Sequence, residues 1–129
     1  MALVADHMTR DLLTVTPEVA LGEAAARMME RGVGAAVVLE GERVAAILTE
    51  RDVMKAVAAG ADGRAPVADW MTRHPDTIEP GDTMDHAGSL MIHGGYRHLP
   101  VVEEGRIVGI VSIRDLMRVA LDDRSPRGV

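Results

Sequence analysis

The sequence predicts a mixed α/β fold (α+β), built from two related units that each hold a small three-stranded sheet and two helices. The first observation is an internal repeat: residues 4–58 match residues 67–121 without a gap, at a constant offset of 63 positions. The second is that each copy shows the β-α-β-β-α order of apolar patterns. One such unit cannot bury both faces of its sheet, so we expect the copies to pack together with approximate two-fold symmetry.

In the first copy, apolar spacing and turn residues predict each element in order. Apolar residues at helical spacing followed by Gly32 predict a helix that stops there. Two apolar runs around Gly41-Glu42 predict a hairpin. The expected elements are a helical turn at Ala5–Met8, an extended segment at Leu13–Val15, a helix at Val19–Arg31, strands at Ala35–Leu39 and Arg43–Leu48, and a helix at Glu50–Ala59.

The second copy repeats this plan. Its expected elements are a turn at Val67–Met71, an extended segment at Thr77-Ile78, a helix at Thr83–His93, strands at Leu99–Val102 and Arg106–Val111, and a helix at Ile113–Leu121. The small, glycine-containing segment that ends at Pro66 is typical of a linker, and the polar C-terminal residues are typical of a flexible tail. The expected division is therefore domain 1 at residues 1–60, a linker at 61–66, domain 2 at 67–121 and a tail at 122–129.

Composition excludes several classes of function. The 129 residues are 47% apolar, enough for a substantial core, and the formal net charge of −6 argues against a general nucleic-acid binder. The absence of cysteine excludes disulfides, thiolate metal sites and cysteine nucleophiles. The start of the sequence does not resemble a signal peptide, and no apolar run approaches the ~20 residues of a membrane span. We expect a soluble cytoplasmic protein.

The candidate binding feature is a strand-to-helix junction that occurs twice, at residues 46–52 and 109–115. In each junction an apolar strand reaches a hydroxyl residue, and an aspartate follows three positions later. The hydroxyl (Thr49 or Ser112) would cap the helix, with the aspartate (Asp52 or Asp115) at its third position. Free backbone N–H groups, a helix dipole and a carboxylate then lie together, which suits a ligand with a phosphate and vicinal hydroxyls. Ordinary capping without a ligand is the alternative.

Several motifs in the right order resemble the cystathionine-β-synthase-type (CBS) domain, two of which in tandem form a Bateman module. They are the Gly-x-x-Ser-x-x-Asp segment at residues 109–115, the Asp-x-Met-Thr segments at residues 6–9 and 69–72, and the Gly-Tyr-Arg-His-Leu-Pro-Val-Val segment at residues 95–102. The resemblance covers residues 4–121 and leaves no room for a catalytic domain, so it implies a stand-alone module.

The resemblance implies a regulatory binding module and not an enzyme. Such pairs bind adenosyl ligands (AMP, ADP, ATP or S-adenosylmethionine) in the clefts between their halves, and they use no catalytic cofactor. They commonly form disc-like homodimers through their helices, and a regulated protein, unidentified here, reads the ligand-dependent change. The alternative is an interaction or oligomerisation module whose nucleotide sites are degenerate.

The resemblance also implies roles for particular residues. The aspartate would hold the ribose hydroxyls, the serine or threonine would reach phosphate or ribose, and basic residues before the proline would meet phosphate. In the second copy the implied nucleotide-binding residues are Thr77, Ile78, Arg97, His98, Pro100, Ser112 and Asp115, and Arg114 at the helix start is a further candidate to contact an anionic ligand, with a solvated position as the alternative. In the first copy they are Thr14, Thr49 and Asp52. We expect the ligand to bind first at the second copy, because the first copy has Ala46 where the second has Gly109 and lacks the basic pair and the proline.

Catalytic and metal sites are not expected. The five histidines have no convincing metal-ligand spacing, and His93 and His98, the nearest pair, are separated by a glycine loop. The sequence shows no paired nucleophile and base and no phosphate-binding glycine loop of the nucleotidase kinds. The remaining function classes are therefore a ligand sensor and a purely structural interaction module.

Overall fold

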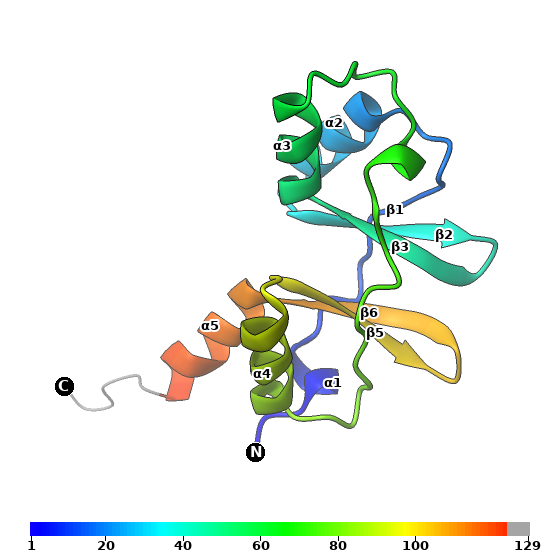
Figure 1. Ribbon diagram of the computed structural model, residues 1–129. Helices are drawn as coiled ribbons and strands as arrows, with labels where there is room; N and C mark the ends of the chain where they lie inside the picture. Colours follow the sequence, from blue (N-terminus) through cyan, green and yellow to red (C-terminus); the bar gives the residue numbers. More distant parts are fainter. Residues whose placement is uncertain (124–129) are drawn as a thin grey trace. The chain divides into compact units, whose positions relative to one another are not determined.

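The computed structural model describes residues 1–123 and divides into two compact units (Figure 1). The first-repeat unit comprises Asp11–Pro75 with Gly105–Ile107, and the second-repeat unit comprises Met1–Arg10, Asp76–Glu104 and the residues from Val108 onward. The predicted mixed α/β class with two units is confirmed. Residues 124–129, most of the predicted tail, lie outside the described part of the chain, whereas residues 122 and 123 continue the last helix.

The first-repeat unit is a four-stranded sheet with the order β1-β2-β3-β4, with two helices on one face (Figure 1). Strand β1 runs parallel to β2, and the other neighbours are antiparallel. The elements are β1 (Thr14–Val15), α2 (Leu21–Arg31), β2 (Ala35–Glu40), β3 (Arg43–Thr49), α3 (Glu50–Ala58), a 3-10 turn η1 (Val67–Asp69) and β4 (Thr72–Arg73).

Side-chain periodicity explains how these elements pack. Helix α2 buries Leu21, Ala24 and Met28 on one stripe and ends at Gly32, whose φ of 66° is the left-handed geometry that glycine adopts without steric cost. That stripe covers the face of the sheet formed by alternate residues of the strands. The shared core comprises Leu13, Val15, Leu21, Ala24, Met28, Ala36, Val38, Ala46, Leu48, Ala56, Val67 and Met71.

The second-repeat unit follows the same plan with fewer regular strand residues. Its elements are α1 (Val4–His7), α4 (Met84–Gly94), β5 (His98–Glu103), β6 (Arg106–Ser112) and α5 (Ile113–Asp123). Single bridges, Ile78 to Val101 (parallel) and Thr9 to Ile110 (antiparallel), flank the β5-β6 pair. They stand at the repeat positions of β1 and β4. The prediction of three strands in each sheet was wrong: one sheet has four strands and the other has two with flanking bridges.

The extra strand arises because each copy's entry segment pairs with the other copy's sheet. The Val4 amide donates to the Asp82 carbonyl at 2.8 Å, and Thr9 and Ile110 exchange backbone hydrogen bonds at 2.8 and 2.9 Å. In the same way, the Val67 amide donates to the Val19 carbonyl at 2.8 Å, and β4 pairs with β3. The packed units therefore follow a different division from the sequence repeat.

Candidate functional site

The predicted site residues of the second copy gather at one end of the β5-β6 hairpin. Strand β5 begins at His98 and β6 ends at Ser112, and the Ile113 amide donates to the Arg97 carbonyl at 2.9 Å. The Ile78 segment lies beside the start of β5, since the Ile78 amide donates to the Pro100 carbonyl at 3.0 Å. All eight second-copy candidates thus lie on segments that meet at this end of the sheet or follow directly from it.

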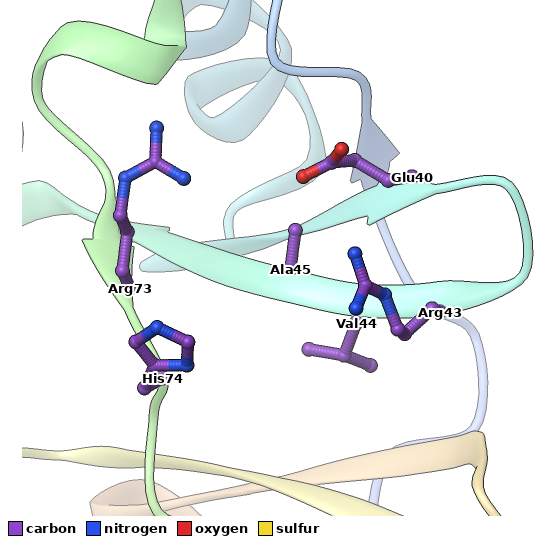
Figure 2. Close-up of a pocket in the computed structure, with 6 residues that line it drawn as sticks. All are labelled: Glu40, Arg43, Val44, Ala45, Arg73 and His74. Carbon is purple, nitrogen blue, oxygen red and sulfur yellow. The ribbon is translucent and has the colours of Figure 1, made fainter.

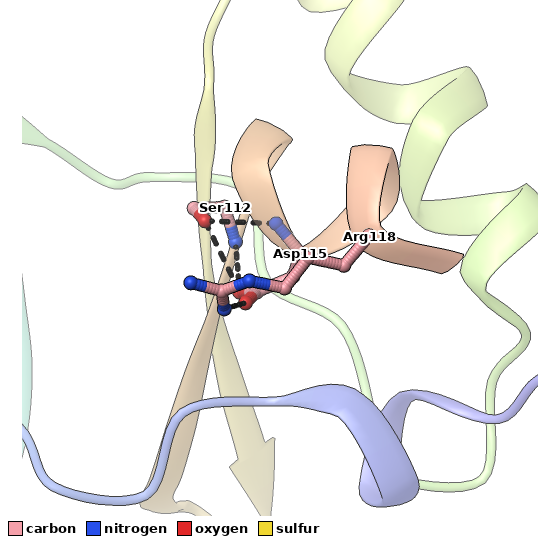
Figure 3. A network of polar contacts seen from close by, with 3 residues as sticks. All are labelled: Ser112, Asp115 and Arg118. Carbon is pink, nitrogen blue, oxygen red and sulfur yellow. Dashed lines mark hydrogen bonds and ion pairs between the residues drawn. The ribbon is translucent and has the colours of Figure 1, made fainter. Parts of the chain in front are cut away.

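The junction between β6 and α5 is a capping box (Figure 3). The Asp115 amide donates to the Ser112 hydroxyl at 3.3 Å, and the Ser112 amide donates to Asp115 Oδ2 at 2.8 Å. The Ser112 hydroxyl also donates to Oδ2, at 3.1 Å. These bonds satisfy backbone groups at the helix start and fix the carboxylate in one orientation. Asp115 is only 4% exposed, so its position is set by the fold and not by solvent.

The second oxygen of Asp115 faces an exchangeable partner. Arg118 Nη1 donates to Asp115 Oδ1 at 3.2 Å, and the Arg118 side chain is 65% exposed (Figure 3). Ion pairs with an exposed partner contribute about 0.2–1 kcal/mol to stability, because water screens them. A ligand hydroxyl could therefore replace the Arg118 guanidinium at Oδ1 at small cost, without disturbing the cap at Oδ2.

The first-copy aspartate has a different environment. Thr49 closes the same capping box, with its amide 2.9 Å from Asp52 Oδ2. In addition, the Thr72 hydroxyl of β4 lies 3.1 Å from Oδ1 and 3.2 Å from Oδ2. Asp52 is 6% exposed, and both of its oxygens thus have hydroxyl or amide donors from the protein. The third first-copy candidate, Thr14, is exposed in β1.

The resemblance also implies that the backbone of the extended segment and of the Leu-Pro-Val segment reads the adenine edge, and Ile78 lies on that extended segment. Its amide is bonded to the Pro100 carbonyl, and its carbonyl accepts from the Val102 amide at 2.8 Å. The Ile78 and Pro100 side chains are buried in the core. The exposed Thr77 is the more accessible part of this segment for a ligand.

Basic side chains distinguish the two copies at this end of the sheet. Arg97 and Arg114 are exposed, and His98 is half-buried and interacts with another group of the protein. The repeat positions of Arg97 and His98 are Gly34 and Ala35. The backbone is alike in both copies, because the Gly34 carbonyl accepts from the Glu50 amide at 3.0 Å as Arg97 does from Ile113. The copies therefore differ in charge and not in the course of the chain.

Gly109 has a packing role that sequence reasoning did not find. A Cβ at this position would lie 2.7 Å from the Met8 sulfur and 3.0 Å from the Thr9 carbonyl oxygen. The close approach expected from the glycine is thus made by the protein's own N-terminal segment. The interpretation that Ala46 harms the first site by intruding a Cβ therefore loses its main argument, since Ala46 is itself fully buried in a packed core.

Tyr96 and Asp76 form a second feature that the sequence analysis missed. The Tyr96 hydroxyl donates to the Asp76 carboxylate at 2.7 Å, across 20 positions of sequence. Burial of the phenol is the larger cause, and the hydrogen bond to the Asp76 carboxylate the smaller one, that raises the pKa of Tyr96 to about 12. A side chain at Gly94 would overlap the Tyr96 ring, which explains the glycine there. The hydrogen bond fixes Asp76, the residue directly before Thr77. The rarity of aromatic residues in this chain is the sequence signal that could have pointed to Tyr96.

Two searches of residues 1–123 bear on other functions. No group of three or more histidine, cysteine, aspartate or glutamate side chains in this range is arranged to hold a metal ion. No helix in the same range is long and apolar enough to cross a membrane.

A sequence model of the CBS domain matches this chain twice, at residues 4–59 and 67–122. The chain belongs to the CBS-domain family. The resemblance expected from the motifs is thereby confirmed, and both matches contain one of the capped aspartates.

Three solved structures are similar over nearly the whole chain. The CBS-domain protein ATU1752 of Agrobacterium tumefaciens is 36% identical, with a TM-score of 0.87, covering 92% of this chain and 99% of that one. PAE2072 of Pyrobaculum aerophilum, complexed with AMP, is 28% identical with a TM-score of 0.85, covering 94% and 96%. The CBS domain pair of MJ0100, in complex with 5′-methylthioadenosine and S-adenosyl-L-methionine, is 25% identical with a TM-score of 0.86, covering 92% and 99%.

Proposed function

We propose that this chain is a regulatory module that binds an adenosyl ligand at the capped end of the second-repeat unit. The observation that carries the proposal is Asp115. Its carboxylate is buried and is oriented by hydrogen bonds from Ser112 to Oδ2, while Oδ1 accepts a hydrogen bond from the solvent-exposed Arg118 guanidinium. The AMP complex of PAE2072 and the adenosyl complexes of MJ0100 support this class of ligand.

The chemistry of the site suits a ribose with an attached anion. A carboxylate accepts hydrogen bonds from two neighbouring hydroxyls, which distinguishes a ribose from a deoxyribose. The exposed guanidinium groups of Arg97 and Arg114 can bind a phosphate with paired hydrogen bonds. Because these groups favour an anion over the cationic sulfonium of S-adenosylmethionine, we propose AMP, ADP or ATP before S-adenosylmethionine.

The first-copy site is proposed to be the weaker one. A ligand hydroxyl at Asp52 would compete with the Thr72 hydroxyl, which contacts both carboxylate oxygens. The positions of Arg97 and His98 carry no charge in this copy. Occupation of Asp52 by the same ligand therefore brings less new hydrogen bonding and no phosphate contact from these two positions.

The proposed signal is a shift in conformational population that a partner protein reads, without catalysis by this chain. We also propose a homodimer through the helices. Each helix pair presents large apolar side chains to solvent: Met29, Met54 and Val57 on α2 and α3, and Ile92, Met117 and Leu121 on α4 and α5. Such exposed apolar surface is typical of protein interfaces.

A pure interaction module is the second candidate function. The saturated carboxylate of Asp52 and the exposed apolar helix faces favour it for the first copy. It predicts that the chain binds no adenosyl ligand, whereas the leading proposal requires that it binds one.

Calorimetric titration of the full chain separates these candidates. We expect AMP to bind with measurable heat, 2′-deoxy-AMP to bind at least about tenfold more weakly for loss of a hydrogen bond to a charged acceptor, and S-adenosylmethionine to bind more weakly than AMP. No heat with AMP, ATP or S-adenosylmethionine, together with a stable dimer by light scattering, would establish the interaction module instead.

A further inference from the structure

A polar hollow lies at the end of the first-repeat sheet away from its capped Thr49-Asp52 junction (Figure 2). It has a volume of about 130 Å³, and its lining residues are Glu40, Arg43, Val44, Ala45, Arg73 and His74. All six belong to the first-repeat unit. None of them is among the residues implied for nucleotide binding.

A β-bulge makes room for this hollow. Val44 pairs with Leu39 and Ala46 pairs with Val38, which leaves Ala45 as an extra residue in β3. Figure 2 shows Glu40, Arg43 and Arg73 on the side of the sheet to which Ala45 points. Since Ala45 has a single methyl group, the long side chains around it border an open space instead of a packed one.

The chain turns sharply at the edge of the hollow. His74 follows β4 with a φ of 51°, a left-handed backbone conformation that is uncommon outside glycine and enriched in histidine, asparagine and aspartate. In Figure 2 the imidazole lies beside the end of β4, on the side of β3 to which Val44 points. A non-glycine residue in this conformation costs free energy, and such residues concentrate at ligand-binding positions.

The charges in the hollow are not neutralised by one another. Five other arginines within residues 1–123 (Arg27, Arg31, Arg64, Arg106 and Arg118) form ion pairs with carboxylates of their own unit. Arg43 and Arg73 have neither an ion pair nor a side-chain hydrogen bond to another described residue, and Glu40 lies beyond ion-pair distance of both. Two guanidinium groups without a carboxylate partner, in a chain of net charge −6, favour an anion.

The size of the hollow sets it apart from a nucleoside site, and its position sets it apart from the capped end of its own unit. Pockets for drug-sized ligands span roughly 300–1,000 Å³, so a hollow of this size suits a phosphate group and not a nucleoside. Strand β3 places Arg43 about 20 Å along the strand from Thr49, at a rise of roughly 3.3 Å per residue. The capped end of this unit and the hollow are thus separate places on one sheet.

We propose that this hollow is an anion site for a phosphate group, held by Arg43 and Arg73. Each guanidinium can donate two parallel hydrogen bonds to phosphate oxygens. Glu40, on the same side of the sheet, opposes the anion electrostatically. The proposal therefore predicts opposite changes in anion affinity: neutralising Glu40 should raise the affinity, and neutralising either arginine should lower it.

The test is titration of the full chain with inorganic pyrophosphate at low ionic strength, followed by calorimetry. Arg43→Gln and Arg73→Gln should each weaken pyrophosphate binding at least fivefold, and Glu40→Gln should strengthen it at least twofold. Arg64→Gln removes a surface arginine of the same unit away from the hollow and should leave the affinity unchanged. Equal affinities for all four variants, weaker binding by Glu40→Gln, or no pyrophosphate binding by the unmodified chain would each overturn the proposal.

Two further ligands distinguish the source of the phosphate and separate this site from the proposed function. If free phosphates are the ligand, adenosine and AMP bind Arg73→Gln as they bind the unmodified chain. If the hollow holds the phosphate of a nucleotide, Arg73→Gln weakens AMP and leaves adenosine unchanged. Asp115→Asn should not alter pyrophosphate binding. The anion site can therefore be confirmed even if the chain binds no adenosyl ligand.

Discussion

Substitution of Gly109 by alanine tests whether Met8 and Thr9 of the N-terminal segment pack tightly against the second-repeat sheet. The new Cβ would lie 2.7 Å from the Met8 sulfur and 3.0 Å from the Thr9 carbonyl oxygen. Met8 can move, but the Thr9 carbonyl accepts the Ile110 amide hydrogen bond at 2.9 Å and cannot move without weakening that bond.

The expected magnitude follows from two opposing effects. Overpacking in a well-packed core costs about 1–3 kcal/mol. Replacing glycine by alanine recovers about 0.4–1 kcal/mol by restricting the unfolded chain. We therefore expect Gly109→Ala to lower the free energy of unfolding by roughly 0.5–2 kcal/mol.

The matched variant is Ala46→Gly, at the same position of the first copy. It removes a methyl group that is fully buried, which costs about 0.8 kcal/mol, and it adds backbone entropy worth about 0.5–1 kcal/mol to the unfolded state. Both exchanges should thus destabilise the protein, although each installs the residue that the other copy has.

Urea denaturation followed by circular dichroism measures both variants. In the double variant Met8→Ala/Gly109→Ala, the truncated side chain leaves space for the new methyl group, so the two changes should be non-additive by about 0.5–1 kcal/mol. A stability of Gly109→Ala equal to or above that of the unmodified chain, or strict additivity with Met8→Ala, would refute the close packing described here.

Three more predictions concern other contacts. Thr72→Val should lower the free energy of unfolding by about 1 kcal/mol in urea denaturation, because Asp52 loses a hydroxyl donor. Thr72→Ser keeps that donor and should retain most of the stability of the unmodified chain. The raised pKa of Tyr96 means that the folded state holds the phenolic proton more tightly than the unfolded state, so stability should fall between pH 10 and about 12. Tyr96→Phe should remove that pH dependence in the same assay, and an unchanged slope would contradict it. Met117→Glu should convert the proposed dimer to a monomer by light scattering, and an unaltered mass would place the interface elsewhere.

The parts of the site that sequence predicted are those set by neighbours in the chain. A hydroxyl residue followed by an aspartate three positions later determines a capping box almost by itself, and both boxes are present as expected. The hairpins and helix ends follow in the same way from local turn residues such as Gly32.

What sequence did not predict depends on partners distant in the chain. The two entry segments are near copies of each other, so the pattern alone does not say that each pairs with the other copy's sheet. The Thr72 hydroxyl at Asp52 follows from that exchange, and so does the glycine at Gly109. The bulge at Ala45 and the pairing of Tyr96 with Asp76 likewise need three-dimensional register, which apolar periodicity does not encode.

The most direct test of the central claim is a calorimetric titration of AMP into Asp115→Asn and Asp52→Asn, with thermal unfolding to verify that both variants fold. Asparagine keeps the shape of the side chain but removes the charge that accepts the ribose hydroxyls. Hydrogen bonds to charged groups contribute about 1.5–3 kcal/mol, so Asp115→Asn should weaken AMP about tenfold or more, whereas Asp52→Asn should change the affinity less than about twofold. Equal losses in the two variants, or a larger loss for Asp52→Asn, would contradict the assignment of the ligand site to the second-repeat unit.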